Sequence, residues 1–169
     1  LLIYLIYIIY DIIPNVDKLT NIANNTTFKL PCFVKAVVCF TGNESVDKIL
    51  NNFGQESPLF ILGGGSNIVL PENMHNTVFI KIQNKDIAIL EQNTENVLLK
   101  IAAGELWDDV VLYACKNGYA GIEAMSAIPG IAGATPIQNV GAYGQEIKDV
   151  LVSLEAYDRI NKINVTITN

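Results

Sequence analysis

The sequence is poor in positive charge. It contains one arginine, Arg159, and ten lysines that are scattered singly, and its formal net charge is −6. A groove that binds nucleic acid needs a clustered basic face, so this composition argues against a DNA or RNA partner. An anionic ligand must then be held mostly by backbone dipoles.

Residues that carry metal or redox chemistry are also few. The three cysteines, Cys32, Cys39 and Cys115, show no CxxC spacing and lie in apolar stretches. We therefore predict buried, reduced thiols and a reducing compartment. The single histidine, His75, follows the polar letters PENM and has no His or Cys partner at ligand spacing, which predicts an exposed loop residue. No metal site is expected.

The N-terminal run LLIYLIYIIYDII lacks the features of a targeting segment. It has no positive start and no small-residue cleavage site, and only ten apolar residues precede Asp11. A signal peptide or membrane span is therefore not supported, and we expect a cytoplasmic protein without a membrane partner. Residues 1–22 are left as an unassigned apolar leader, with an extra strand as the alternative. Because the sequence begins with Leu1, we interpret it as a fragment.

A β-α-β unit is predicted in the first half. The β-branched run at 33–40 predicts a strand, and residues 46–53 form a helix pattern that Ser45 can cap and Gly54 can end. The all-apolar letters LFIL at 59–62 predict a short strand covered on both faces.

The rest of the chain alternates short strand patterns with turns, and it has no internal repeat or low-complexity linker. A helix at 106–116 carries an apolar stripe typical of core packing, so Trp107 is not interpreted as a ligand contact. The other patterns predict strands at 67–70, 77–82, 86–90 and 97–103, and a hairpin with strands at 150–158 and 162–168.

The run FILGGGSNIVL raises the question of what comes close to three consecutive glycines. It is not a Rossmann loop, because Ile68 stands where the third glycine is required, and it lacks the G-K-[ST] of a P-loop. Successive N–H groups of residues 64–67, with the Ser66 and Asn67 side chains, are suited to an anion nest. A glycine-lined hairpin turn is the alternative.

A second loop, SAIPGIAGATPIQNVGAYGQE, has almost no side-chain bulk. Loops of this length without structure of their own are usually functional. Small residues let the main chain approach a large flat ligand, while Thr135, Gln138 and Asn139 can donate specific hydrogen bonds. Tyr143 can stack on a ligand or pack. Tight packing against a sheet explains the alanines but not the polar trio.

The motifs ILGGGSNIVL, AAGELW and GIEAMSAIPGIAGATPIQNVGAYGQEI, in this order, resemble those of the UDP-N-acetylenolpyruvoylglucosamine reductases, the MurB flavoenzyme family. The resemblance covers roughly residues 24–169. It implies an α+β fold of the FAD-binding PCMH, or vanillyl-alcohol-oxidase, type with two α/β subdomains. We place the first FAD-binding subdomain at 23–81 and the second, incomplete, at 82–169, truncated before the substrate-binding domain.

The resemblance also implies FAD as cofactor and NADPH as reductant. In the family the hydride passes from NADPH through the flavin to the enolpyruvyl group of a UDP-sugar, in peptidoglycan synthesis. Residues 63–67 then bind the pyrophosphate, and residues 128–144 line the remaining cofactor, including the flavin ring. The cofactor-binding residues implied are Gly63, Gly64, Gly65, Ser66, Asn67, Ile128, Pro129, Gly130, Gly133, Ala134, Thr135, Gln138, Asn139, Gly141, Ala142, Tyr143 and Gly144.

The family's catalytic residues have no counterpart here. Its active-site arginine lies in an F-x-Y-R-x-S segment after the hairpin, whereas Arg159 lies in the hairpin turn. No catalytic side chain is therefore assigned, and a monomer is expected. One alternative is a degenerate FAD-binding module without reductase activity. Another oxidase of the same flavin superfamily fits less well, because many of those tether FAD through a histidine and His75 is misplaced for that role.

Overall fold

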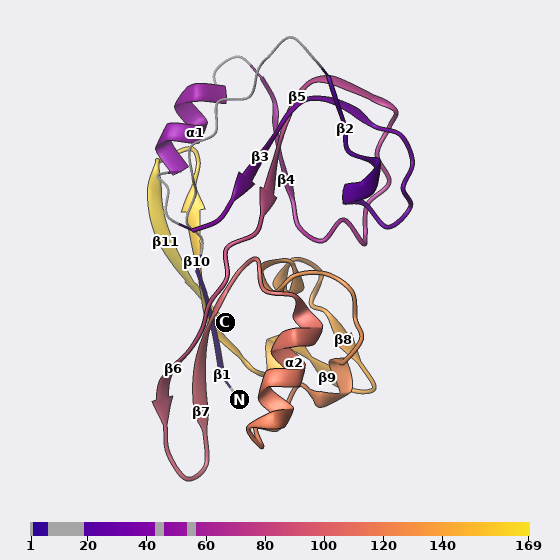
Figure 1. Ribbon diagram of the computed structural model, residues 1–169. Helices are drawn as coiled ribbons and strands as arrows, with labels where there is room; N and C mark the ends of the chain where they lie inside the picture. The colour runs from indigo at the N-terminus through magenta and orange to yellow at the C-terminus, as the bar shows by residue number, and fades with distance from the viewer. Residues whose placement is uncertain (1, 7–18, 43–45, 54–56) are drawn as a thin grey trace. The chain divides into compact units, whose positions relative to one another are not determined.

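The computed structural model describes residues 2–6, 19–42, 46–53 and 57–169. It divides the chain into two compact units, unit 1 with Leu1–Tyr7 and Asn84–Asn169, and unit 2 with Ile8–Gln83 (Figure 1). The assignment of residues 23–81 and 82–169 to two FAD-binding subdomains remains a prediction. Ser45 and Gly54, the expected cap and end of the first helix, lie outside the described residues.

Unit 2 is built on a four-stranded sheet with the order β2-β3-β5-β4. Both β3 and β4 pair with β5 in parallel, so β5 separates the two strands of the predicted β-α-β unit. The elements are β2 (Thr20–Asn21), the 3-10 helix η1 (Ala23–Asn25), β3 (Phe33–Phe40), α1 (Val46–Phe53), β4 (Leu59–Leu62) and β5 (Asn73–Ile82).

Buried side chains lie on both faces of β5, a central strand of this sheet, because Phe79 is buried and so are its neighbours Val78 and Ile80. The cluster that includes Phe79 has the buried residues Ile22, Cys32, Val34, Leu62 and Phe79. Phe60 stacks on Phe79 with ring centroids 4.7 Å apart. The predicted strands at 33–40 and 59–62 and the helix at 46–53 are confirmed.

Two predictions in unit 2 are wrong. The β4 strand is not covered on both faces: Phe60 and Leu62 pack on the core, but Ile61 on the opposite face is 50% exposed. Residues 67–70 form no strand, and Ile68 and Leu70 instead pack against the core from a loop. Apolar residues can be buried without a ladder partner, so the sequence pattern is the same in both cases.

Unit 1 contains a five-stranded sheet with the order β11-β10-β1-β7-β6. The first strand, β1, pairs in parallel with both β7 and β10, so part of the unassigned leader is the extra strand given as the alternative. The strands are β1 (Leu2–Ile6), β6 (Ile87–Gln92), β7 (Val97–Ala102), β10 (Leu151–Asp158) and β11 (Ile163–Thr168).

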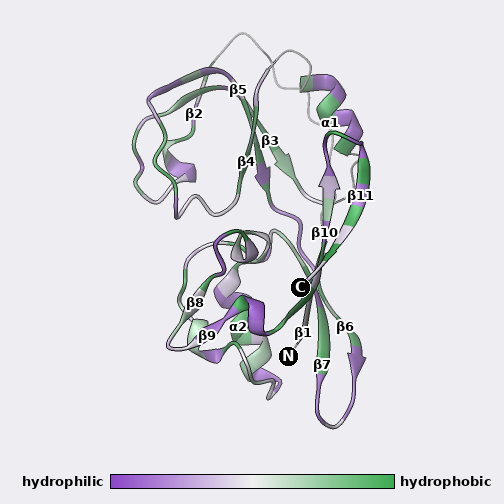
Figure 2. Ribbon diagram, turned by 180° about the vertical axis from the view of Figure 1, so that it is seen from behind, coloured by the Kyte–Doolittle hydropathy of each residue, from purple (hydrophilic) through white to green (hydrophobic). Residues whose placement is uncertain are grey.

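One helix, α2 (Trp107–Lys116), and several short elements complete unit 1. In Figure 2 the β7 strand is mostly green, whereas the end of β6 is purple. Most of β7 is buried, whereas β6 is an edge strand with its last residues exposed. The short elements are η2 (Glu123–Met125), η3 (Ala132–Gln138), β8 (Gly141–Ala142), β9 (Gln145–Glu146) and η4 (Ile147–Asp149).

The core of unit 1 brings β7 and α2 against the second glycine-rich stretch. Trp107 is the largest of its buried side chains, and its Nε1–H donates to the Met125 carbonyl oxygen at 3.1 Å. The buried members are Val97, Leu99, Ile101, Trp107, Val110, Val111, Ala114, Ile122, Met125, Ala132, Ile147 and Val150. The predicted helix and the β10–β11 hairpin are confirmed, and Trp107 is a core residue as expected.

The cysteine prediction holds only in part. All three cysteines are free, but only Cys32 is buried, while Cys39 is half-buried and Cys115 is exposed. Cys115 lies on the solvent side of α2, outside its apolar stripe. His75 is exposed as predicted, although it lies in the β5 strand rather than in a loop.

Candidate cofactor-binding segments

The first segment, residues 63–67, leaves β4 and packs against the backbone that follows η1. The Thr27 N–H donates to the Gly65 carbonyl oxygen at 3.0 Å. Gly65 has φ +68°, and a Cβ added there would overlap the Asn25 carbonyl oxygen and lie 3.0 Å from Thr26 Cα. The close approach that requires Gly65 therefore comes from the chain itself.

The other side of this segment is open. Gly64 and Asn67 are exposed, and Gly63 and Ser66 are half-buried. Both Ser66 and Asn67 make polar interactions within the protein. A ligand can therefore reach Gly64 and Asn67, while Gly65 packs against the backbone of residues 25–27.

The second segment begins beside the start of α2. An isolated antiparallel bridge joins Leu106 and Ile131. The Ala132 N–H donates to the Glu105 carbonyl at 2.8 Å, and the Gly133 N–H donates to the Ala103 carbonyl at 2.8 Å. A Cβ on Gly133 would lie 2.6 Å from Ala103 Cβ. Close packing of two backbone stretches therefore explains why residue 133 is a glycine. This agrees with the alternative that small residues in this loop serve tight packing.

The expectation that this stretch lacks structure of its own is wrong. Residues 132–138 form the η3 helix, and 141–146 form the β8–β9 hairpin. Thr135 is buried, and its hydroxyl donates to the Ala132 carbonyl at 2.8 Å. Gln138 is exposed. Of the three polar residues, Thr135 therefore donates its hydroxyl hydrogen within the η3 helix, because a buried hydroxyl needs a partner.

Tyr143 is the most exposed large side chain of this segment. It is 97% exposed, so the interpretation that it packs within the protein is wrong. Tyr143 and Gly144 form the two-residue turn of the hairpin with φ +52° and +87°, the pattern of a type I′ turn. Gln145, next along β9, accepts the Ala124 N–H at 2.7 Å and ties the hairpin to η2. The fold thus presents an aromatic ring on a braced turn.

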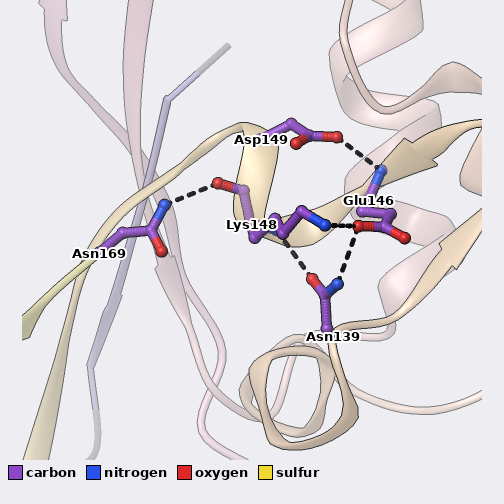
Figure 3. A network of polar contacts seen from close by, with 5 residues as sticks. All are labelled: Asn139, Glu146, Lys148, Asp149 and Asn169. Atoms are coloured by element: carbon purple, nitrogen blue, oxygen red, sulfur yellow. Dashed lines mark hydrogen bonds and ion pairs between the residues drawn. The ribbon is translucent and has the colours of Figure 1, made fainter.

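Asn139 is the centre of a polar network that fixes the same hairpin (Figure 3). It has φ +48°, its Nδ2 donates to Glu146 Oε2 at 3.0 Å, and its Oδ1 accepts the Lys148 N–H at 3.2 Å. Lys148 also forms an ion pair with Glu146, and Asp149 accepts the Glu146 N–H at 3.1 Å. The Asn169 side chain donates to the Lys148 carbonyl at 2.7 Å. Glu146 was not predicted from the sequence as a residue of this segment's network, because its role depends on these partners.

This network makes the stability of unit 1 sensitive to acid. Hydrogen bonds from Lys148 and Asn139 lower the pKa of Glu146 below its usual value. Because the pKa is lower in the folded state, the ionised carboxylate stabilises the protein at pH values above the unfolded-state pKa of about 4.3. This stabilisation is lost as the pH falls through the folded-state pKa. We expect the unfolding midpoint to drop on acidification below about pH 5, and Glu146→Gln to make that drop shallower.

The measurement is thermal unfolding followed by circular dichroism from neutral pH to about pH 3. Glu91→Gln, at an exposed position on β6 outside the network, makes the same change of charge and is the control. Equal slopes for the two variants would contradict a role for the network.

Each of the two segments, taken by itself, leaves several residues accessible. In the first segment Gly64 and Asn67 are exposed, and in the second Pro129, Gly141 and Gly144 are exposed. Small residues and accessible main-chain amides suit a diphosphate and a flat ring system in a chain with few basic residues. The remaining predicted contacts, Ile128, Gly130, Ala134 and Ala142, are half-buried.

Other kinds of site find little support in the described part of the chain. No group of three or more His, Cys, Asp or Glu residues there is placed to hold a metal ion. None of the helices described has the length and apolar character that a membrane crossing requires.

Comparison with known proteins identifies the class. The chain belongs to the FAD binding domain family, which matches residues 34–163. It is similar in structure to the UDP-N-acetylenolpyruvylglucosamine reductase (MurB) of Thermus caldophilus, with a TM-score of 0.63 at 19% identity over 89% of this chain and 52% of that one. The predicted FAD-binding fold is confirmed.

Within this class the chain corresponds to the FAD-binding portion of the UDP-N-acetylenolpyruvoylglucosamine reductases. It is 36% identical over 145 residues to that reductase from Psychrobacter arcticus, covering 83% of this chain and 39% of the relative. With the Neisseria meningitidis reductase it shares 38% identity over 152 residues, covering 89% and 43%. The chain thus spans about two fifths of the length of these relatives.

Proposed function

We propose that this chain supplies the FAD-binding part of a reductase that converts UDP-N-acetylenolpyruvoylglucosamine to UDP-N-acetylmuramate, with NADPH as reductant, in cytoplasmic peptidoglycan synthesis. The observation that carries the proposal is the identity of 36–38% to named reductases over more than four fifths of the chain. The acidic composition fits a small-molecule substrate better than a nucleic acid, and the proposal takes the protein to be a monomer.

Each unit has its own task in this proposal. In unit 2, residues 63–67 receive the FAD pyrophosphate on the side where Gly64 and Asn67 are exposed. In unit 1, residues 128–144 line the rest of the cofactor, including the flavin ring. When bound, FAD supplies the hydride-transfer chemistry. The chain's own contribution is to bind and orient it, and no side chain here is assigned a catalytic role.

Asn67→Asp tests the pyrophosphate assignment without disturbing the core, because Asn67 is exposed. A new carboxylate beside a diphosphate repels it, and we expect the dissociation constant for FAD to rise about tenfold, which corresponds to about 1.4 kcal/mol. Asn96→Asp, at an exposed position in the β6–β7 turn, makes the same change elsewhere and should leave binding unchanged. FAD titration followed by flavin fluorescence measures both.

The reductase assignment needs a separate assay. The purified chain should show the visible absorbance bands of bound flavin. NADPH oxidation with and without the UDP-sugar then separates an active reductase from a flavin-binding module that lacks the reaction. A chain that binds no flavin would contradict the proposal at its first step.

A further inference from the structure

The residue that leads into the second segment has a strained backbone. Ala127 has φ +61°, in the left-handed region that is unfavourable for a residue with a Cβ. It directly precedes Ile128, the first residue of the proposed flavin-lining stretch. Strain of this kind persists only where the surroundings hold it, and it concentrates at functional sites.

Asp108, in the first turn of α2, is the group that holds this conformation. Its Oδ1 accepts the Ala127 N–H at 2.6 Å and the Ser126 hydroxyl at 2.8 Å. These same two hydrogen bonds lower the pKa of Asp108, so the acceptor is ionised at neutral pH. Three exposed residues are therefore locked together by one carboxylate oxygen.

Trp107 fixes the same stretch on either side of Ala127. Its indole Nε1–H donates to the Met125 carbonyl, and its backbone N–H donates to the Gly130 carbonyl, both at 3.1 Å. The two ends of residues 125–130 are thus set by Trp107, and the path between them by Asp108. The direction in which Ile128 leaves the turn is fixed by this arrangement.

We propose that Asp108 is a positioning residue for FAD, holding Ala127 in its left-handed conformation so that residues 128–130 meet the flavin in the correct orientation. This inference rests on the proposed assignment of residues 128–144 to the flavin. Asp108 itself is not placed against the cofactor, and its effect passes through the backbone of Ala127.

Asp109 provides a matched control. It lies in the same first turn of α2, is exposed, and carries the same charge beside the same helix dipole. Asp108→Asn and Asp109→Asn therefore remove equal charge from the helix start, and only the first weakens the acceptor that holds Ala127. A difference between them isolates the hydrogen bonds from the electrostatics of the helix.

The experiment measures the FAD dissociation constant of the 169-residue chain, the visible circular dichroism of the flavin at saturation, and the unfolding midpoint without FAD. We expect Asp108→Asn to raise the dissociation constant about fivefold and to change the dichroism of the bound flavin. Asp109→Asn should match the parent in both. The midpoint identifies any variant whose weaker binding reflects poor folding.

Ala127→Gly, added to Asp108→Asn, tests the route of the effect. Glycine adopts φ +61° without the Cβ penalty, so the double variant should recover most of the affinity and the parental dichroism. If the double variant did not recover the affinity for FAD, or if the two Asn variants behaved alike, the role of Asp108 would be overturned. The proposed function would still stand in that case, provided that the parent chain binds FAD. A parent chain that binds no FAD would overturn both.

Discussion

Gly65→Ala is expected to unfold the sheet of unit 2 and to abolish FAD binding. A methyl group at this position overlaps the Asn25 carbonyl oxygen and meets Thr26 Cα at 3.0 Å, and both are backbone atoms that cannot rotate away. The left-handed φ of +68° adds strain. We expect a loss of about 2–5 kcal/mol in the free energy of unfolding, a large share of the stability of a small unit.

Gly118→Ala separates the clash from the backbone strain. Gly118 follows α2 with φ +74°, and a Cβ there would meet nothing within 4 Å, so its cost is about 1 kcal/mol. Hydrogen exchange across β3, β4 and β5 measures the cost of Gly65→Ala in unit 2, and exchange across β7 and α2 measures the cost of Gly118→Ala in unit 1. The emission of Trp107, the single tryptophan, reports on unit 1 and should stay unchanged in Gly65→Ala. Equal costs for the two variants would show that packing behind Gly65 is unimportant.

The elements that the sequence predicted well are those with a strong local pattern. The β3 strand alternates half-buried and buried residues along its full length, and its limits of Phe33 and Phe40 agree with the prediction. The hairpin of β10 and β11 was found because residues 159–161, with the letters RIN, separate two strand-like runs. Apolar and polar residues alternate along β11, which Figure 2 shows as green and pale bands.

The position of β1 could not be read from the sequence. Its run of apolar letters is compatible with a strand, a leader or a buried helix, since periodicity alone does not separate these. Its insertion in parallel between β7 and β10 depends on pairings with residues more than ninety positions away. Such long-range pairing leaves no local signal.

The candidate site was predicted in outline, but for reasons that the structure changes. The small residues suggested room for a ligand, yet Gly65 and Gly133 are required by close approach of the chain to itself. The polar donors suggested ligand contacts, yet Asn139 binds Glu146 and the Lys148 backbone. The roles of Asp108 and Glu146 were not predicted, because a carboxylate that anchors a loop looks in sequence like any surface acid.

Trp107→Ala is expected to destabilise unit 1 by about 3–5 kcal/mol, the usual cost of removing a buried aromatic side chain. Trp107 is 1% exposed and lies in the cluster that joins β7, α2 and η2. Its loss leaves a cavity and deprives the buried Met125 of the N–H that its carbonyl accepts. Because Met125 begins the stretch that leads to Ala127, we also expect FAD binding to weaken beyond the loss of folded protein.

Two variants separate the contributions of Trp107. Trp107→Phe keeps most of the ring volume but removes the N–H, so it should cost about 1–3 kcal/mol for the unsatisfied carbonyl. Leu112→Ala lies on the same helix at a position 49% exposed and should change stability by about 0.5 kcal/mol or less. Denaturant unfolding followed by far-ultraviolet circular dichroism ranks the three. If Trp107→Ala cost no more than Leu112→Ala, the core of unit 1 would not be organised around the indole, and the anchoring of residues 125–130 to α2 would have to come from backbone contacts alone.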